Sequence, residues 1–241
     1  MEEGILRYSR GMEVAMTASV FPHLSSDWIC QMMLCGCFIW LASPLCSSSE
    51  SDWFISGRAG RKAWNAGNCL ALILFAFLYT VCVIFISILL LLPCTVFSTE
   101  WGAGWNTLAL TNVGEDYQVE LTISRVILHY YKPIPAMLWS FLLEFLCLAW
   151  LGTMMDTINA LTGKTVGLYC ALAFIFLDMM LYNTGLERFY RFSPITLAQL
   201  GNYNAGMAKY GVSLWSTILF FIGGILVFLP IRILIPEKKD L

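Results

Sequence analysis

Long apolar runs alternate along this chain with shorter polar segments. A helix needs about 20 consecutive apolar residues to cross the hydrocarbon core of a bilayer. Five stretches meet this requirement and predict membrane spans: Trp28–Cys46, Cys69–Leu92, Ala136–Met155, Thr165–Tyr182 and Gly211–Leu229. The pattern therefore predicts an all-α, polytopic transmembrane helix bundle with about five spans. We place it in a membrane domain over residues 28–235, between an N-terminal segment, 1–27, and a tail, 236–241.

Two of the predicted spans contain an acidic residue well inside the apolar run. Glu144 lies in the third span and Asp178 lies towards one end of the fourth. Ionisable groups at this depth are costly and are candidates for function by default. We therefore predict a role for both on a transport path or in gating. The alternative is that Glu144 is hydrogen-bonded inside the bundle and that Asp178 lies close to the outer interface.

The composition strengthens the membrane assignment and excludes several other functions. Only 12% of residues are charged, against roughly a quarter in soluble domains, and the mean hydropathy is +0.72. A net charge of -2 argues against a nucleic-acid partner, which needs a surplus of cations on one face. Seven of the nine cysteines lie in apolar stretches, where they behave as small hydrophobic residues. We expect neither a metal site nor a cofactor.

Motifs for catalysis are weak. Gly163-Lys164-Thr165 ends like a Walker motif, but Ile158 stands where its first glycine is required, so a basic turn is favoured. His23 and His129 have no metal-binding spacing and are interpreted as surface histidines. Nothing supports hydrolytic chemistry, and we expect no enzyme activity. An intramembrane enzyme that uses the two span acids is the least favoured function.

Cations predict the orientation of the spans. They cluster in three places on one side of the alternating spans: Arg58, Arg61 and Lys62; Lys164; and Arg232, Lys238 and Lys239. Short basic loops stay in the cytoplasm. The loop over 50–67 and the C-terminus are therefore predicted to be cytoplasmic, and residues 1–27 extracellular, in a multi-pass protein of the cell membrane. The lack of an Asn-x-Ser/Thr glycosylation site favours a bacterial plasma membrane.

Tryptophans lie near the predicted span ends, where their rings favour the membrane interface. We expect five of them to act as interfacial anchors: Trp28, Trp64, Trp101, Trp105 and Trp215.

Several phrases of the sequence resemble a known family. The stretch ESDWFISGRAGRKAW, followed by ALILFAFLYTVCVIFISILLLLP and FSTEWG, is similar to the corresponding part of bacterial ABC transporter permeases of the type-two exporter class, particularly those of Gram-positive bacteria. The later phrases SFLLEFLCLAWLGTMMDTINALTGKTVGLYCALAFIFLD and RFSPITLAQLG are similar to the second half of such permeases. The resemblance covers roughly residues 28–235. Six spans are usual in the family, so its first span is expected to be absent here.

The resemblance implies partners and a contact surface. In the family, a cytoplasmic loop docks into a cleft of a separate ABC ATPase subunit, and it corresponds here to Asp52–Trp64. The implied contact residues are Trp53, Phe54, Arg58, Arg61, Lys62 and Trp64. The resemblance also implies a second permease chain, identical or different, with the substrate path between the two chains in the lipid bilayer.

We therefore expect a permease subunit of an ABC transporter, which moves a substrate with ATP hydrolysed by a separate subunit. The alternative is a non-transporting membrane sensor or immunity protein. Such a protein would bind an extracellular peptide through Pro93–Pro135 and Asn183–Tyr210. An ATPase gene beside the gene of this chain would favour the permease, and a peptide-toxin cluster would favour the alternative.

Overall fold

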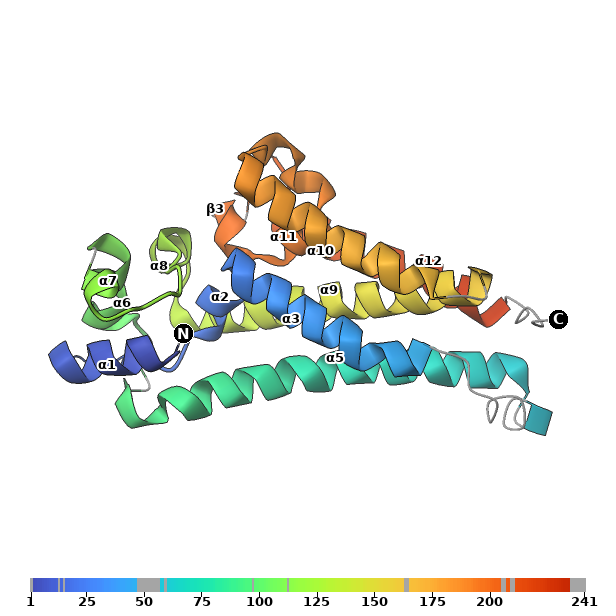
Figure 1. Ribbon diagram of the computed structural model, residues 1–241, viewed down its shortest axis with the longest axis horizontal. Helices are drawn as coiled ribbons and strands as arrows, with labels where there is room; N and C mark the ends of the chain where they lie inside the picture. The colour runs from blue at the N-terminus through green and yellow to red at the C-terminus, as the bar shows by residue number, and fades with distance from the viewer. Residues whose placement is uncertain are drawn as a thin grey trace.

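Five long helices build the body of the molecule, and short helices gather at one end of it (Figure 1). The computed structural model describes residues 2–12, 14, 16–46, 57–58, 60–96, 98–111, 113–162, 165–204, 207–208 and 211–234. The long helices are α3 (Trp28–Ala42, continued by the 3-10 turn η1, Ser43–Cys46), α5 (Arg61–Leu91), α9 (Pro133–Thr162), α10 (Val166–Thr184) and α12 (Leu214–Leu234). Each is long and apolar enough to cross a membrane. The predicted all-α bundle with five spans is confirmed.

Helix α5 begins earlier than the sequence predicted. The expected start was Cys69, but the helix starts at Arg61, directly after Gly60. Gly60 has a positive φ of 86°, a conformation that glycine adopts without steric cost, and this sets the point at which the helix begins. Arg61, Lys62 and Trp64 therefore lie in the first turns of a helix and not in a loop.

Helices α9 and α12 run further than predicted. The third span was expected to end at Met155, but α9 continues and takes in Asp156. Helix α12 continues past Pro230, the residue expected to close it. A proline inside a helix frees backbone groups, and membrane helices tolerate this where neighbouring side chains bond to them. Close to the proline, the Thr157 hydroxyl of α9 donates to the carbonyl of Phe228 at 3.4 Å, a contact that joins α12 to α9.

Helix α9 is the centre of the bundle and packs against the other four long helices. Of its most apolar stretch 56% is buried, against 39% or less in the other four, so those helices turn large apolar side chains outwards. An aromatic cluster joins α9 to its neighbours around one tryptophan. Trp150 contacts Phe174 of α10 and Phe220, Phe221 and Phe228 of α12.

Two glycines let the neighbouring helices approach α9 closely. A Cβ atom on Gly224 of α12 would lie 2.1 Å from Nε1 of Trp150. A Cβ atom on Gly167 of α10 would lie 2.2 Å from the carbonyl oxygen of Met155. Gly167 belongs to the Gly-x-x-x-Gly spacing of the sequence, whose first member, Gly163, lies outside the described residues. Small residues at such contacts are typical of packed membrane helices.

The short helices form a cap at one end of the bundle. The cap combines the N-terminal segment with the chain between α5 and α9, so residues far apart in sequence share one core (Figure 1). Its elements are α1 (Glu2–Met12), β1 (Met16–Thr17), α2 (Phe21–Leu24), η2 (Leu92–Cys94), β2 (Thr95–Val96), α6 (Gly102–Leu110), α7 (Val113–Asp116) and α8 (Arg125–Tyr130). Strands β1 and β2 pair in parallel, with Met16 opposite Thr95.

The chain between α10 and α12 turns back into the bundle. It contains η3 (Glu187–Phe192), α11 (Pro194–Ala198), η4 (Leu200–Asn202) and the antiparallel pair β3 (Tyr203–Asn204) and β4 (Met207–Ala208). All five residues of α11 are buried, and the Cys147 thiol, half-way along α9, lies 3.9 Å from the carbonyl oxygen of Pro194. Irregular backbone at membrane depth is tolerated where protein surrounds it, so we call residues 193–203 the re-entrant segment.

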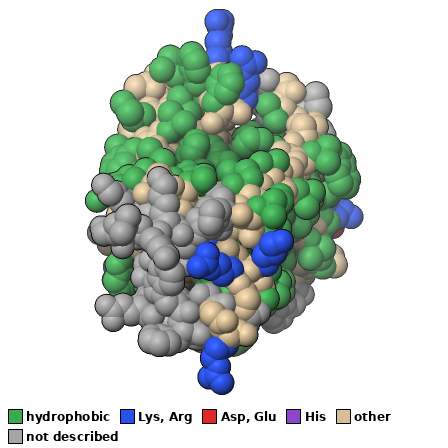
Figure 2. Space-filling model, turned by 90° about the vertical axis from the view of Figure 1, so that its right-hand side faces the viewer, with side chains coloured by type: hydrophobic (Ala, Val, Ile, Leu, Met, Phe, Trp, Pro, Cys, Tyr) green, Lys and Arg blue, Asp and Glu red, His purple; other side chains and the backbone are tan. Residues whose placement is uncertain are grey.

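The end opposite the cap is basic. Helix α5 starts there, α9 gives way to α10 there, and α12 ends there (Figure 1). The described members of the cation clusters, Arg58, Arg61, Lys62 and Arg232, therefore belong to the same end of the molecule, and Lys164, Lys238 and Lys239 lie outside the described residues. Figure 2 faces this end, where lysine and arginine side chains stand between hydrophobic ones. Arg58, Arg61 and Lys62 are all exposed.

The two adjacent glycines of α12 offer a matched test of this packing. Gly224→Ala places a methyl group against the Trp150 ring, which is itself held by four phenylalanines, and we expect a loss of about 1–3 kcal/mol from overpacking. Gly223→Ala meets no atom within 4 Å, so it should leave stability unchanged or raise it by about 0.5–1 kcal/mol. Thermal unfolding of both variants in detergent micelles, followed by tryptophan fluorescence, measures the difference. Equal midpoints for the two variants would contradict the close contact.

Candidate functional site

Polar and thiol side chains from four elements meet in the middle of the bundle. This mid-bundle polar cluster consists of Gln31 and Cys35 of α3, Ser140, Glu144 and Cys147 of α9, Asp178 of α10, Thr196 of α11 and Gln199. Both acids that the sequence singled out belong to it. The cluster lies where α3, α9, α10 and the re-entrant segment come together.

Glu144 ties α9 to α3. Its carboxylate is 1% exposed, and its Oε2 accepts a hydrogen bond of 2.7 Å from the side-chain amide of Gln31. Gln31 and Glu144 each keep one buried oxygen, Oε1, without a hydrogen-bond partner among the described residues, as does the Ser140 hydroxyl. Buried polar atoms are nearly always satisfied, so this part of the cluster has unused capacity to bind a hydrogen-bonding group.

Asp178 holds the re-entrant segment in place. The Thr196 hydroxyl donates to its Oδ1, and the Gln199 amide donates to its Oδ2 at 3.4 Å. The side chain is 3% exposed, so protein encloses it. The reason is that α11 folds back over this part of α10, which the apolar pattern of the span could not indicate. The alternative interpretation that Asp178 lies close to the outer interface stays a prediction.

Two buried thiols, of Cys35 and Cys147, lie close to both Glu144 and Asp178. Cys35 and Cys147 lie near each other, and both acids are close enough to act on both thiols electrostatically. Cys37, two residues along α3, is exposed, so Cys35 and Cys37 point to different sides of the helix. Glu144 and Asp178 are closed in by protein here, and a role for them on a transport path stays a prediction.

A buried ion pair forms a second polar site near the basic end. Arg232 Nε donates to Asp156 Oδ2 at 2.8 Å, with side-chain exposures of 5% and 3%. The sequence placed Arg232 in a cation cluster at the cytoplasmic C-terminus; the cytoplasmic location stays a prediction, and the structure shows that the Arg232 side chain is buried. Because α12 continues beyond Pro230, the arginine is carried along the helix into contact with α9. The sequence signal that could have revealed the pair is an acid and a base near the same-side ends of two spans.

Helix α5 closes on this ion pair from the side. The Asn65 amide donates to the carbonyl oxygen of Arg232 at 3.2 Å. The Cys69 thiol lies 4.0 Å from Oδ2 of Asp156. Both residues follow the cations of the first turn of α5 by one to two helical turns. The beginning of α5 is thereby joined to α9 and α12 at a single buried point.

Four of the implied ATPase-contact residues lie at the basic end, away from the mid-bundle polar cluster. Arg58, Arg61 and Lys62 are exposed, and Trp64 is half-buried. Trp53 and Phe54 lie outside the described residues.

The cap buries a histidine that the sequence analysis took for a surface residue. His23 is fully buried and stacks on Trp105 with ring centroids 5.1 Å apart, while its Nδ1 accepts from the backbone N–H of Ser124 at 3.3 Å. Burial lowers the pKa of His23 to about 3, so the ring is neutral at physiological pH. The expected anchors Trp101 and Trp105 are likewise buried in the cap, because the N-terminal segment covers them. His129 is exposed, as expected.

Comparisons with protein-family models, with curated proteins and with solved structures give no match to this chain. The fold alone therefore defines the class of protein. Its five long apolar helices give the chain the architecture of a multi-pass membrane protein. Within the described part of the chain, no three His, Cys, Asp or Glu side chains gather as metal ligands would.

The ion pair predicts a specific pattern of stability. Asp156→Leu leaves the Arg232 charge buried without its partner, which should cost about 3–5 kcal/mol. The double variant Asp156→Leu with Arg232→Met removes both charges and should recover most of that loss. Unfolding midpoints of the two variants in detergent decide the matter. If the single variant is as stable as the double variant, the pair does not hold the helices together.

Proposed function

We propose that the chain is the permease subunit of an ABC transporter. A separate ATPase subunit would bind at the basic end, and a second permease chain would complete the substrate path. The protein would reside in a bacterial plasma membrane, with the basic end in the cytoplasm. The resemblance of the sequence to type-two exporter permeases motivates the proposal, and the arrangement of α5 supports it best.

Helix α5 links the two ends of the molecule. Its 31 residues give a length of about 46 Å at 1.5 Å per residue. It begins with the exposed Arg61 and Lys62 at the basic end and reaches the cap, where it contacts α1. Near its beginning, Asn65 and Cys69 touch the ion pair between α9 and α12. A displacement of the segment before α5 would therefore act on three spans at once.

This arrangement gives ATP hydrolysis a mechanical route into the membrane domain. Closure of the ATPase would move the segment over 50–67, and α5 would tilt with its first turn. The ion pair would pass the motion to α9 and α12. Because α9 also carries Glu144, whose partner lies on α3, the centre of the bundle would respond to the same motion. Access to the substrate path would switch as the spans tilt.

The contact with the ATPase can be tested by removing aromatic side chains and keeping all cations. Trp53→Ala with Phe54→Ala should weaken binding of the ATPase encoded beside this chain's gene by at least about thirtyfold, since truncation of an interface hot spot costs about 2 kcal/mol or more. Co-purification from detergent and titration of the purified subunits measure the loss.

Trp40→Ala is the matched control, because Trp40 of α3 is 75% exposed on a membrane span and lies outside the proposed contact. It should leave ATPase binding unchanged. The proposal is contradicted if the double variant inserts in the membrane and retains full affinity, or if no ATPase binds the unmodified chain.

A further inference from the structure

Two adjoining cavities form a groove in the cap between α6 and α8. They have volumes of about 310 Å³ and 530 Å³, and they share Asn106, Leu128 and His129 as lining residues. We call the joined space the cap groove. It lies within Pro93–Pro135, at the end of the molecule opposite the proposed ATPase contact, so it is accessible from the other side of the membrane in the proposed orientation.

One wall of the groove is basic. Arg125 and His129 line it four residues apart on α8, a spacing that aligns side chains along one face of a helix, and Lys132 lines it just beyond the end of α8. Arg125 is fixed, because its Nε donates to the carbonyl oxygen of Ala109 at 2.7 Å, and its two Nη groups have no partner within the described part of the chain. Among the described residues that line the two cavities, Glu100 is the single acid. The balance of charge favours an anionic ligand.

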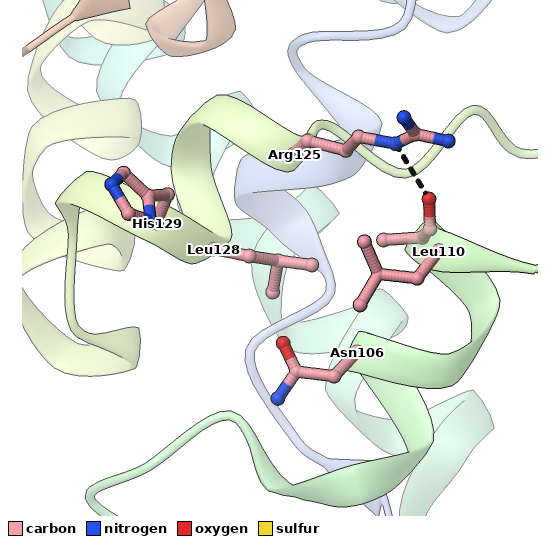
Figure 3. Close-up of a pocket in the computed structure, with 6 residues that line it drawn as sticks. Asn106, Leu110, Arg125, Leu128 and His129 are labelled. Atoms are coloured by element: carbon pink, nitrogen blue, oxygen red, sulfur yellow. Dashed lines mark hydrogen bonds between the residues drawn. The ribbon is translucent and has the colours of Figure 1, made fainter.

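The opposite wall is made of small and neutral side chains of α6. Ala103 and Asn106 are exposed there, and the Asn106 amide nitrogen bonds to the carbonyl oxygen of Gly102 at 2.9 Å. Its carbonyl oxygen is left as an acceptor for a backbone N–H of a ligand. Figure 3 shows Asn106 and Leu110 of α6 facing Leu128 of α8 across the cavity. The middle of the groove is thus apolar, with polar groups around it.

The two permanent cations are too far apart for one small anion. Arg125 lines only the first cavity and Lys132 only the second. From Arg125 to the end of α8 the chain rises about 7.5 Å, and Lys132 lies two residues beyond that end, so the two cations are on the order of 10 Å apart. In Figure 3 Arg125 reaches to one side of the cavity and His129 to the other, so the basic side chains diverge. A single phosphate or carboxylate would meet only one of them. An extended peptide covers roughly 10 Å in three residues.

We propose that the cap groove binds a short extended peptide segment that carries two carboxylates three residues apart. One carboxylate bonds to the guanidinium of Arg125 and the other to the ammonium of Lys132. An apolar side chain between them lies against Leu110 and Leu128. The site does not depend on the proposed transport function, because peptide binding requires neither an ATPase nor transport.

The test uses the full chain in lipid nanodiscs and two fluorescein-labelled peptides, Glu-Leu-Ala-Glu and its neutral counterpart Gln-Leu-Ala-Gln. Fluorescence anisotropy measures both affinities without ATPase or ATP. The acidic peptide should bind at least tenfold more tightly, because each charge-assisted hydrogen bond is stronger than a neutral one. Its affinity should fall with rising salt. Equal affinities for the two peptides would overturn the proposal.

Variants locate the site. Lys132→Gln should weaken the acidic peptide about tenfold, and Ala103→Trp should abolish binding by filling the groove from an exposed position of α6. Arg10→Gln is the matched control, because it removes an exposed cation of the cap that does not line either cavity. The proposal fails if Arg10→Gln weakens binding as much as Lys132→Gln.

A lipid headgroup is the competing occupant. The proposal also fails if short-chain phosphatidylglycerol binds and the peptide does not, with lipid binding weakened by Lys132→Gln and Ala103→Trp but not by Arg10→Gln.

Discussion

A polar side chain inside a bilayer has no water to bond with, so it must find its partner on a neighbouring helix. This constraint organises the molecule around α9. Glu144 bonds to α3 through Gln31, Asp156 pairs with α12 through Arg232, and Asn159 donates to the carbonyl oxygen of Cys46 at the end of η1, at 3.3 Å. Apolar packing alone would let these helices slide or rotate, whereas each polar contact fixes one neighbour at one height along α9.

The two polar sites of the bundle differ in how fully their buried polar atoms are hydrogen-bonded. Near the basic end, the Asp156–Arg232 pair is a closed contact on which three helices converge. In the middle, the mid-bundle polar cluster combines satisfied bonds with buried oxygens that lack partners, and Asp178 ties the re-entrant segment to it. A motion that begins at the basic end would meet a rigid joint first and a less satisfied polar centre next. This order is compatible with the proposed function, in which the membrane domain is driven from one end.

The sequence predicted the fold class and the number of spans, because a continuous apolar run is a direct consequence of lipid contact. It also identified Glu144 and Asp178, since a charge within such a run stands out. The span pattern did not by itself indicate the ion pair, because Asp156 followed the predicted end of a span and a proline preceded Arg232. Nor could it reveal the cap, in which Trp105 and His23 stack across a separation that no local pattern records. These features depend on tertiary contacts between distant segments.

The orientation of the two ends is the claim on which the functional account depends. Cysteine labelling in an otherwise cysteine-free chain tests it most directly, with Gly57→Cys at the basic end and Glu115→Cys in the cap, both at exposed positions. A membrane-impermeant maleimide applied to intact bacterial cells should label Glu115→Cys, and it should label Gly57→Cys only after the membrane is permeabilised. Strong labelling of Gly57→Cys on intact cells would place the basic end outside and contradict the account.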